Sequence, residues 1–268
     1  MEEFNEESLR GINEVVGNAE HALGFSEKII RKLTDWGTSL SALDKDNILR
    51  LLTFAVQSEA EYSGLMHEAD ELLKQAGMLT PAQRLKLEEL SDAAKRVLAV
   101  SQAAKANIYA LPGKATYEDR NGNFSQFDPE VIETLEQATK DYKLAYNTFS
   151  DFDASFRPGK EQETKHKCLT QLFQSWAGAH FMLAFDYEQF GKLKIRASEN
   201  NVDKLMEGMT ILDMAIGHYK RITQVADKAA RAGIQLDNRF TSIAQEGMTQ
   251  IAKSGASLAT TIGLNLSD

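Results

Sequence analysis

The chain has little cysteine and little proline, and it has no long apolar run. Its 268 residues include one cysteine, Cys168, and four prolines. A lone cysteine excludes a disulfide within the chain and a zinc cage built from cysteines. A membrane-spanning helix needs roughly 18 or more apolar residues in succession, so we expect none. Residues 1–7 are acidic and lack the apolar core of a signal peptide, which predicts a cytoplasmic protein.

An excess of basic residues is also missing. The formal net charge is −9, and residues 1–80 hold 15 acidic and 7 basic side chains, whereas the rest of the chain is close to neutral. Proteins that bind nucleic acids normally carry a basic stripe. The charge therefore argues against nucleic acid as a partner. Contact with an anionic membrane stays open if basic residues gather on one face.

The signatures of common enzymes are absent as well. The sequence contains no GxxxxGK[ST], GxGxxG, GxSxG or HExxH motif, so neither a phosphate cradle nor a nucleophile elbow is expected. None of the five histidines has a metal-ligand spacing, and His180 and His218, on or beside apolar stripes, are predicted to be core or boundary residues. We expect a non-enzymatic protein that needs no cofactor and no metal.

One stretch partly resembles a calcium-binding loop. Five of its residues match EF-hand ligand positions: Asp119, Asn121, Asn123, Ser125 and Glu130. Phe124 stands where the EF-hand loop requires glycine. We interpret the stretch as a polar turn within a non-helical insert over residues 111–128.

Helix-forming residues at helical spacing are what the sequence has in abundance. An apolar stripe with alternating steps of four and three predicts long packed helices. It runs through Val131, Leu135, Ala138, Tyr142, Ala145, Phe149, Phe152 and Phe156, and resumes in shifted phase through Leu169, Leu172, Trp176, His180, Leu183, Tyr187 and Phe190. The predicted fold class is all-α, with long antiparallel helices in a coiled-coil-like bundle.

The breaks between helical runs allow two architectures. They fall near residues 40, 78, 119, 158, 199 and 235, a spacing that fits a seven-helix up-and-down array. Alternatively, residues 1–196 form a three-rod core bent at Gly77–Pro81 and Pro158–Gly159, with additional helices over 201–264. Either way we expect a single elongated helical domain over 1–268.

Two groups of side chains are candidates for contacts outside the chain. Basic residues cluster near the two bends and are candidate membrane contacts: Arg157, Lys160, Lys165, Lys167, Arg84, Lys86, Lys95 and Arg96. Large aromatic residues surround one helix and place 169–193 at the bundle centre or in a subunit interface: Phe173, Trp176, Phe181, Phe185 and Tyr187. Four methionines, Met206, Met209, Met214 and Met248, could form an adaptable groove, but their spacing favours a place in the core.

Three stretches carry a family resemblance: KIIRKLTDWG (28–37), VIETLEQATKDYKLAY (131–146) and HKCLTQLFQSWAGAHFMLAF (166–185). With them, residues 10–196 resemble BAR-type membrane-curvature modules, and the first two are also similar to the BAR-like core proteins of fungal eisosomes. The resemblance implies three bent antiparallel helices that dimerise into a crescent with basic residues on its curved face. The acidic N-terminal third and the lack of a strongly basic tip depart from that pattern.

The sequence thus predicts a helical scaffold that binds, and shapes, anionic membranes as a homodimer at the periphery of the membrane. The alternative is a helical adaptor that holds a partner helix or peptide in a groove between helices, or a helical bacterial effector. If Pro158–Gly159 is a complete break, the chain is closer to vinculin-like bundles or to the Bro-type domains of ESCRT adaptors.

Overall fold

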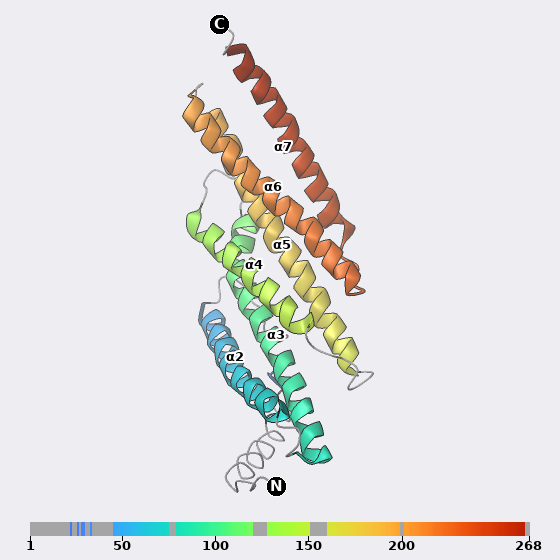
Figure 1. Ribbon diagram of the computed structural model, residues 1–268. Coiled ribbons are helices and arrows are strands. Elements are labelled where there is room, and N and C mark those ends of the chain that lie inside the picture. The colour runs from blue at the N-terminus through green and yellow to red at the C-terminus, as the bar shows by residue number, and fades with distance from the viewer. Residues whose placement is uncertain are drawn as a thin grey trace. The chain divides into compact units, whose positions relative to one another are not determined.

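The computed structural model describes residues 22, 26, 28–29, 33, 45–74, 79–119, 128–150, 160–198 and 201–265. These residues confirm the all-α prediction, since they form helices and connections and contain no strand. The helices are α2 (Lys45–Lys74), α3 (Pro81–Asp119), α4 (Pro129–Ser150), α5 (Lys160–Arg196), α6 (Val202–Arg231) and α7 (Asn238–Asn265) (Figure 1). No helix in the described part of the chain has the length and apolar character to cross a membrane.

Side chains just before the helices determine where the helices begin. Thr80 and Gln83 form a capping box ahead of α3: the Gln83 backbone N–H donates to Thr80 Oγ1 (3.3 Å) and the Thr80 N–H donates to Gln83 Oε1 (3.0 Å). Asp128 caps α4 by accepting from the Glu130 N–H (3.0 Å), and Asn201 caps α6. In Thr80–Pro81 and Asp128–Pro129 the capping residue is followed by a proline at the first helical position, where the missing N–H costs no helical hydrogen bond.

The turn after α6 depends on one glycine. Gly233 has a φ of +72°, which disfavours residues that carry a Cβ. The Ile234 N–H donates to Ala229 O (2.8 Å) and the Gly233 N–H to Ala230 O (3.0 Å), the two bonds of a Schellman motif. The buried Ile234 side chain completes the motif, and the predicted break at Gly233 is confirmed.

The chain divides into two compact units. Unit 1 comprises Met1–Ile108 with Asp141–Leu169, and unit 2 comprises Tyr109–Lys140 with Thr170–Asp268. Three helices, α3, α4 and α5, contribute residues to both units. Each unit is described by itself below.

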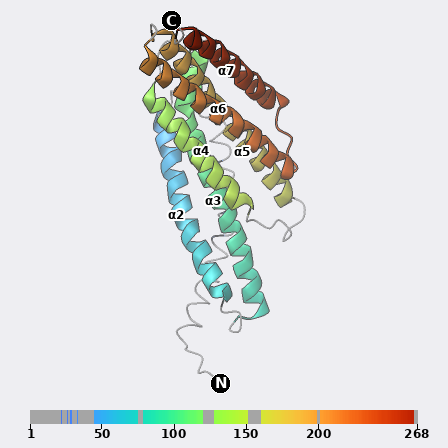
Figure 2. The ribbon, with the colours of Figure 1, turned by 45° about the horizontal axis from the view of Figure 1, so that its top comes forward.

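In unit 1, α2 and α3 form an antiparallel hairpin (Figure 2). Ser91 donates to Asp70 (2.7 Å) near the connection, whereas Lys105 pairs with Glu59 (2.6 Å) farther from it. An apolar cluster of Ala69, Leu87 and Leu90 closes the connected end. The Gly77–Pro81 break is therefore a reversal of the chain and not the bend that the three-rod architecture requires there.

Polar contacts extend unit 1 to α4. Gln102 on α3 donates to Glu59 on α2 (3.3 Å) and accepts from Thr148 on α4 (2.9 Å), so one amide links three helices. Tyr142 donates to Asn107 (2.6 Å). The Tyr62 hydroxyl donates to Ala22 O (2.9 Å), and burial raises the Tyr62 pKa to about 12.

The prediction of a non-helical insert over 111–128 is wrong for its first part. Helix α3 continues to Asp119, so residues 111–119, including Pro112, are helical. Pro112 has no N–H to donate to the carbonyl of Ile108, so one backbone hydrogen bond is missing there. Helix α3 nevertheless continues on both sides of Pro112. Residues 120–127, with most of the EF-hand-like positions, and the Pro158–Gly159 break lie outside the described residues.

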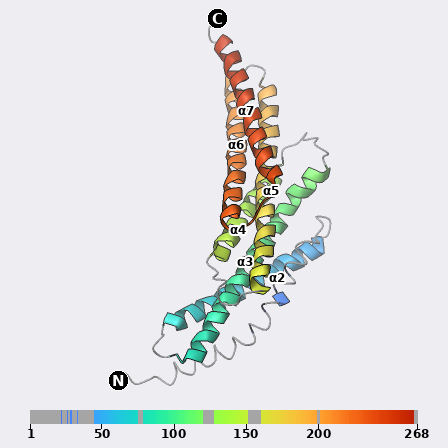
Figure 3. The same cartoon turned by 90° about the vertical axis from the view of Figure 1, so that its right-hand side faces the viewer.

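In unit 2, α5 and α6 pack closely in antiparallel directions, and α7 lies along α6 (Figure 3). Glycines allow the close approach. A Cβ at Gly208 would lie 2.7 Å from Ile195 Cγ1 on α5, and one at Gly247 would lie 2.4 Å from Tyr219 Cζ. Small residues therefore bring the backbones of the three helices together.

The predicted apolar stripes have mixed outcomes. The described side chains of the α4 stripe, from Val131 to Ala145, are buried, and so are Leu169 to Tyr187 on α5. On α6, Leu205, Leu212 and Tyr219 are buried, whereas Val202 is exposed. The α6 contact face includes Gly208, Ala215 and His218, which an apolar pattern does not register.

Candidate functional site

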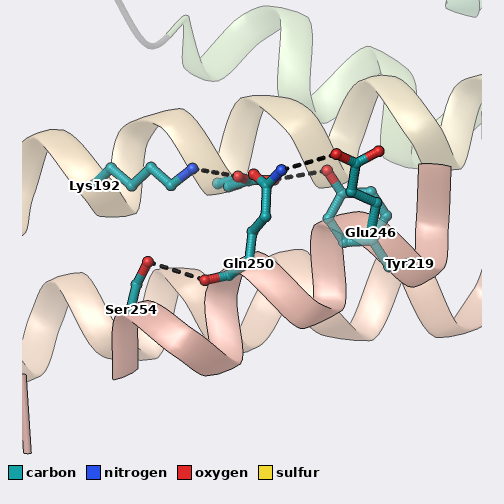
Figure 4. Close-up of polar contacts among 6 residues, drawn as sticks. Lys192, Tyr219, Glu246, Gln250 and Ser254 are labelled. Atoms are coloured by element: carbon teal, nitrogen blue, oxygen red, sulfur yellow. Dashed lines mark hydrogen bonds and ion pairs between the residues drawn. The ribbon is translucent and has the colours of Figure 1, made fainter. Parts of the chain in front are cut away.

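Among the described residues of unit 2, the most buried charged group is the carboxylate of Glu188 on α5. Tyr219 on α6 donates its hydroxyl to Glu188 Oε2 (2.7 Å), and Lys192, one turn along α5, pairs with Oε1. Figure 4 labels Lys192 and Tyr219 and marks their contacts with dashed lines. Because both oxygens are satisfied and a cation is adjacent, the buried negative charge is compensated.

Two histidines meet between α5 and α6. His180 Nδ1 and His218 Nδ1 are 3.1 Å apart, and both side chains are buried. One nitrogen must donate and the other accept, so the accepting ring is neutral and carries its proton on Nε2. Burial, the neighbouring His218 and Arg221 lower the His180 pKa to about 3. Burial and Arg221 lower the His218 pKa to about 4.

A tyrosine extends this polar cluster to α4. Tyr187 donates to Glu136 Oε1 (3.0 Å), and its ring stacks on His218 with centroids 5.6 Å apart. Burial raises the Tyr187 pKa, and the hydrogen bond to Glu136 adds to the effect. The cluster therefore joins α4, α5 and α6 through groups that satisfy one another.

The chemistry of this cluster favours a structural role. Its histidines are neutral, its glutamate is paired and its tyrosines donate to carboxylates, so each described group has a partner. Among the described residues, no three histidine, cysteine or acidic side chains are grouped so that they could hold a metal. The prediction that His180 and His218 are satisfied core residues is confirmed.

The candidate interface aromatics lie mostly inside the chain. Phe173, Trp176 and Tyr187 are buried, and Phe181 and Phe185 are half-buried, with their rings 6.1 Å apart. Phe173 stacks on Trp176 with centroids 6.4 Å apart. Of the two places predicted for this helix, the centre of the bundle accounts for the three buried rings.

The candidate membrane-contact residues in the described part of the chain belong to unit 1. Arg84 is exposed and pairs with Glu88 (3.1 Å), and Lys167 is exposed. Lys86, Lys95 and Arg96 are half-buried, and the side chain of Lys160 lies outside the described part of the structure. Lys165 is half-buried, and Arg157 lies outside the described residues.

The methionines are where the structure departs most from the sequence prediction. Met206 is 55% exposed and Met214 is 43% exposed, whereas Met209 and Met248 are half-buried. The prediction of core positions is therefore wrong for Met206 and Met214. Tyr219, Leu212 and Gly208 occupy the packed face of α6 instead, and they direct the two methionines to solvent.

Four exposed residues form a continuous row along α6. Val202, Met206, Thr210 and Met214 are four residues apart, the spacing of a ridge on a helix surface. Val202 is 60% exposed, and the Thr210 hydroxyl donates to Met206 O (3.0 Å) within the helix. We call these four residues the α6 ridge. The four-residue step of this row can be read from the sequence, but the exposure of its side chains cannot.

The charges beside the α6 ridge are mainly acidic. Asp203, Glu207 and Asp213 are exposed on the same half of the helix, and Lys204 is the one basic residue within 202–214. Glu207 accepts from Lys194 on α5 (2.9 Å). The ridge therefore combines adaptable apolar side chains with a negative border.

A second exposed row lies on α2, on the side opposite its core face. Leu49 is 64% exposed and Val56 is 48% exposed, although Leu51, Ala55 and Tyr62 of the same helix are buried. An apolar pattern that assigns each helix a single buried face does not reveal such a row.

Comparison with protein-family models, with curated proteins and with solved structures finds no match to this chain.

Proposed function

We propose that the chain is a non-enzymatic helical scaffold that binds an amphipathic helix of another protein along the α6 ridge. The observation that carries this proposal is the exposure of Met206 and Met214 in a single row with Val202. Large apolar side chains gathered on an exposed helix face are typical of interaction surfaces. Methionine suits such a surface, since its flexible, polarisable side chain adapts to different partners.

The geometry of the row supports a helix as the occupant. Residues at steps of four form a ridge that packs into the groove of a facing helix. The Thr210 hydroxyl is already bonded within α6, so it does not require a polar partner across the interface. An amphipathic helix with anchors at steps of three and four would cover the ridge.

The acidic residues beside the α6 ridge favour a partner with basic residues. Asp203 and Asp213 flank the row and have no ion pair among the described contacts. Opposite charges across a rim favour encounter and register. The occupant that fits best is a helix with leucine-like anchors on one face and lysine or arginine beside them.

A designed peptide tests the proposal. We would measure binding of a labelled amphipathic helix of leucine and lysine by fluorescence anisotropy, with a leucine–glutamate helix of the same apolar face for comparison. The lysine peptide is expected to bind the unaltered chain, and Met206→Gln with Met214→Gln to weaken binding about 30-fold. This corresponds to about 2 kcal/mol for two half-exposed methionines.

Control variants distinguish specific binding at the α6 ridge from non-specific binding of the peptide. Gln224→Ala, exposed on α6 beyond the ridge, should bind the peptide as the unaltered chain does. Equal affinity for both peptides, or an affinity unchanged by the two glutamines, would contradict the proposal. Circular dichroism of each variant confirms that α6 is folded.

A second candidate, contact with an anionic membrane, rests on one observation in unit 1. Leu85 is 49% exposed near the start of α3, directly between Arg84 and Lys86. An apolar side chain between two cations near a helix reversal can insert among headgroups while the cations meet phosphate. The ion pair of Arg84 with Glu88 weakens this arrangement.

Co-sedimentation with phosphatidylcholine vesicles, with and without phosphatidylserine, tests the membrane candidate. Binding should require phosphatidylserine and fall on Leu85→Ser and on Lys165→Glu with Lys167→Glu. Lys220→Glu with Lys253→Glu, two exposed lysines of unit 2, makes the same change of charge elsewhere. If both pairs weaken binding equally, net charge is the cause and the assigned surface is wrong.

A further inference from the structure

The outer face of α2 carries a second row of residues that no described part of the chain covers. Leu49, Thr53, Val56, Ala60, Ser63 and His67 are all exposed, and their steps alternate between four and three. This is the spacing of a coiled-coil seam. The row contains no formal charge at neutral pH between Leu49 and Ser63, and we call these six residues the α2 seam.

The seam lies opposite the face by which α2 joins unit 1. Leu51, Ala55, Ser58, Tyr62 and Ala69 are buried on the inner face. Leu49 and Val56, at 64% and 48% exposure, are on the outer one. The helix therefore has two apolar stripes, and only one of them packs against other described residues of the chain.

We propose that the α2 seam is the contact surface for a second copy of this chain, with the two α2 helices antiparallel and related by a two-fold axis near residue 58. Each seam residue then meets the residue equally far on the other side of that centre. Val56 lies against Ala60 of the partner subunit, and Thr53 lies against Ser63 of the partner subunit. Large residues facing small ones let two helices approach closely.

The charges beside the seam favour this occupant and this direction. The basic Arg50 is exposed in the first half of α2, and the acidic Glu61 and Glu68 are exposed in the second half. In the antiparallel pair, Arg50 comes within two residues, about 3 Å, of the level of Glu68 of the partner subunit, and the symmetry makes this contact twice. Asp46 comes within one residue of the level of Glu71 of the partner subunit, whose charge is paired with Lys74.

A parallel pair would place the charges badly. An in-register parallel pair would leave Arg50 and Glu68 of the partner subunit 18 positions, about 27 Å, apart along the helix axis, so this contact between opposite charges would be lost. A membrane is a poor occupant as well, since the acidic second half of α2 would face anionic headgroups. The surface is therefore complementary to itself in one orientation. This inference concerns α2 and does not rest on the function proposed for α6.

Sedimentation velocity of the full chain tests the inference. The expected result is a concentration-dependent dimer with twice the 29.8 kDa mass of one chain. Val56→Arg should give a monomer. Leu144→Arg puts the same cation at an exposed apolar site on α4 and should leave the dimer intact.

Charge reversal tests the register without relying on loss of folding. Arg50→Glu should weaken the dimer about tenfold, and adding Glu68→Arg should restore it. The two residues are 18 positions apart on one straight helix, so they cannot meet within a chain. Restoration can therefore arise only between two copies.

Cross-linking tests the direction. In a Cys168→Ser background, Gln57→Cys lies close to the two-fold axis and should form a disulfide dimer under mild oxidation. Thr53→Cys would be ten residues out of level with its counterpart, about 15 Å, and should not. Equal cross-linking at both sites would indicate a parallel pair and overturn the inference. So would a monomer at all concentrations, or a failure of Glu68→Arg to restore the dimer.

Discussion

Replacing both buried histidines of unit 2 with leucine should remove much of the pH dependence of folding. His180 and His218 are neutral in the folded chain, because burial and Arg221 lower their pKa values to about 3 and about 4. In the unfolded chain both return to about 6.5. Between pH 6.5 and 4 the unfolded state therefore binds more protons than the folded state, and acid favours unfolding.

The size of the effect follows from linkage. Near pH 5.5 each histidine is mostly protonated when unfolded and neutral when folded, so the pair contributes a slope of roughly 2.5 kcal/mol per pH unit. Between pH 7 and pH 5, the free energy of unfolding should fall by about 4 kcal/mol through these two residues. Stability is lost as the pH falls, which is the direction for a base whose folded pKa is depressed.

Urea denaturation followed by circular dichroism measures this change. His180→Leu with His218→Leu should show a much smaller loss between pH 7 and pH 5 than the unaltered chain, whereas His67→Gln, at an exposed site on α2, should retain the full loss. Glu188 and Glu136, which also belong to the polar cluster, are present in every variant, so the comparison isolates the two histidines. Parallel pH profiles for the double leucine variant and the unaltered chain would refute the reasoning.

Three substitutions test the packing of unit 2 by thermal or urea unfolding. Gly247→Ala should destabilise the chain by about 1–3 kcal/mol because its Cβ would lie 2.4 Å from Tyr219 Cζ, whereas Gly255→Ala, with open space around it on the same helix, should be neutral or stabilising. Gly233→Ala should cost about 1 kcal/mol, since alanine at a φ of +72° is strained; an unchanged midpoint would contradict the Schellman turn. Tyr219→Phe should cost about 1–3 kcal/mol because it removes the hydroxyl that donates to the buried Glu188, and no loss would show that water replaces it.

The helices and their starts could be predicted from the sequence because their signals are local. Thr80–Pro81 combines a capping side chain with a residue that needs no N–H, and both act within one turn. The α4 stripe was equally clear, since Leu135, Ala138 and Tyr142 are apolar at heptad spacing and pack as that spacing implies. In both cases, interactions between residues close in sequence were sufficient for the prediction.

The direction of the chain after a break could not be predicted. A kink and a reversal at Gly77–Pro81 leave the same local pattern, and only the contacts distinguish them. Ser91 with Asp70 and Lys105 with Glu59 pair residues 21 and 46 positions apart. Such contacts depend on tertiary packing, which propensity and periodicity do not record.

The exposed methionines and the buried Glu188 were missed for a related reason. Hydropathy predicts that methionine is buried and glutamate is exposed. The face of α6 that packs against α5, however, depends on how closely the backbones of the two helices can approach. Gly208 faces Ile195 at a distance that allows no Cβ, and this contact turns Met206 and Met214 outward.

The same close packing of α5 and α6 brings Tyr219 to Glu188, where a hydrogen bond compensates a charge that would otherwise be costly to bury. A shift of α6 by one residue would leave that carboxylate without Tyr219 and the two histidines without each other. The polar cluster therefore penalises alternative registers of α5 and α6, and in the packed register the α6 ridge faces solvent.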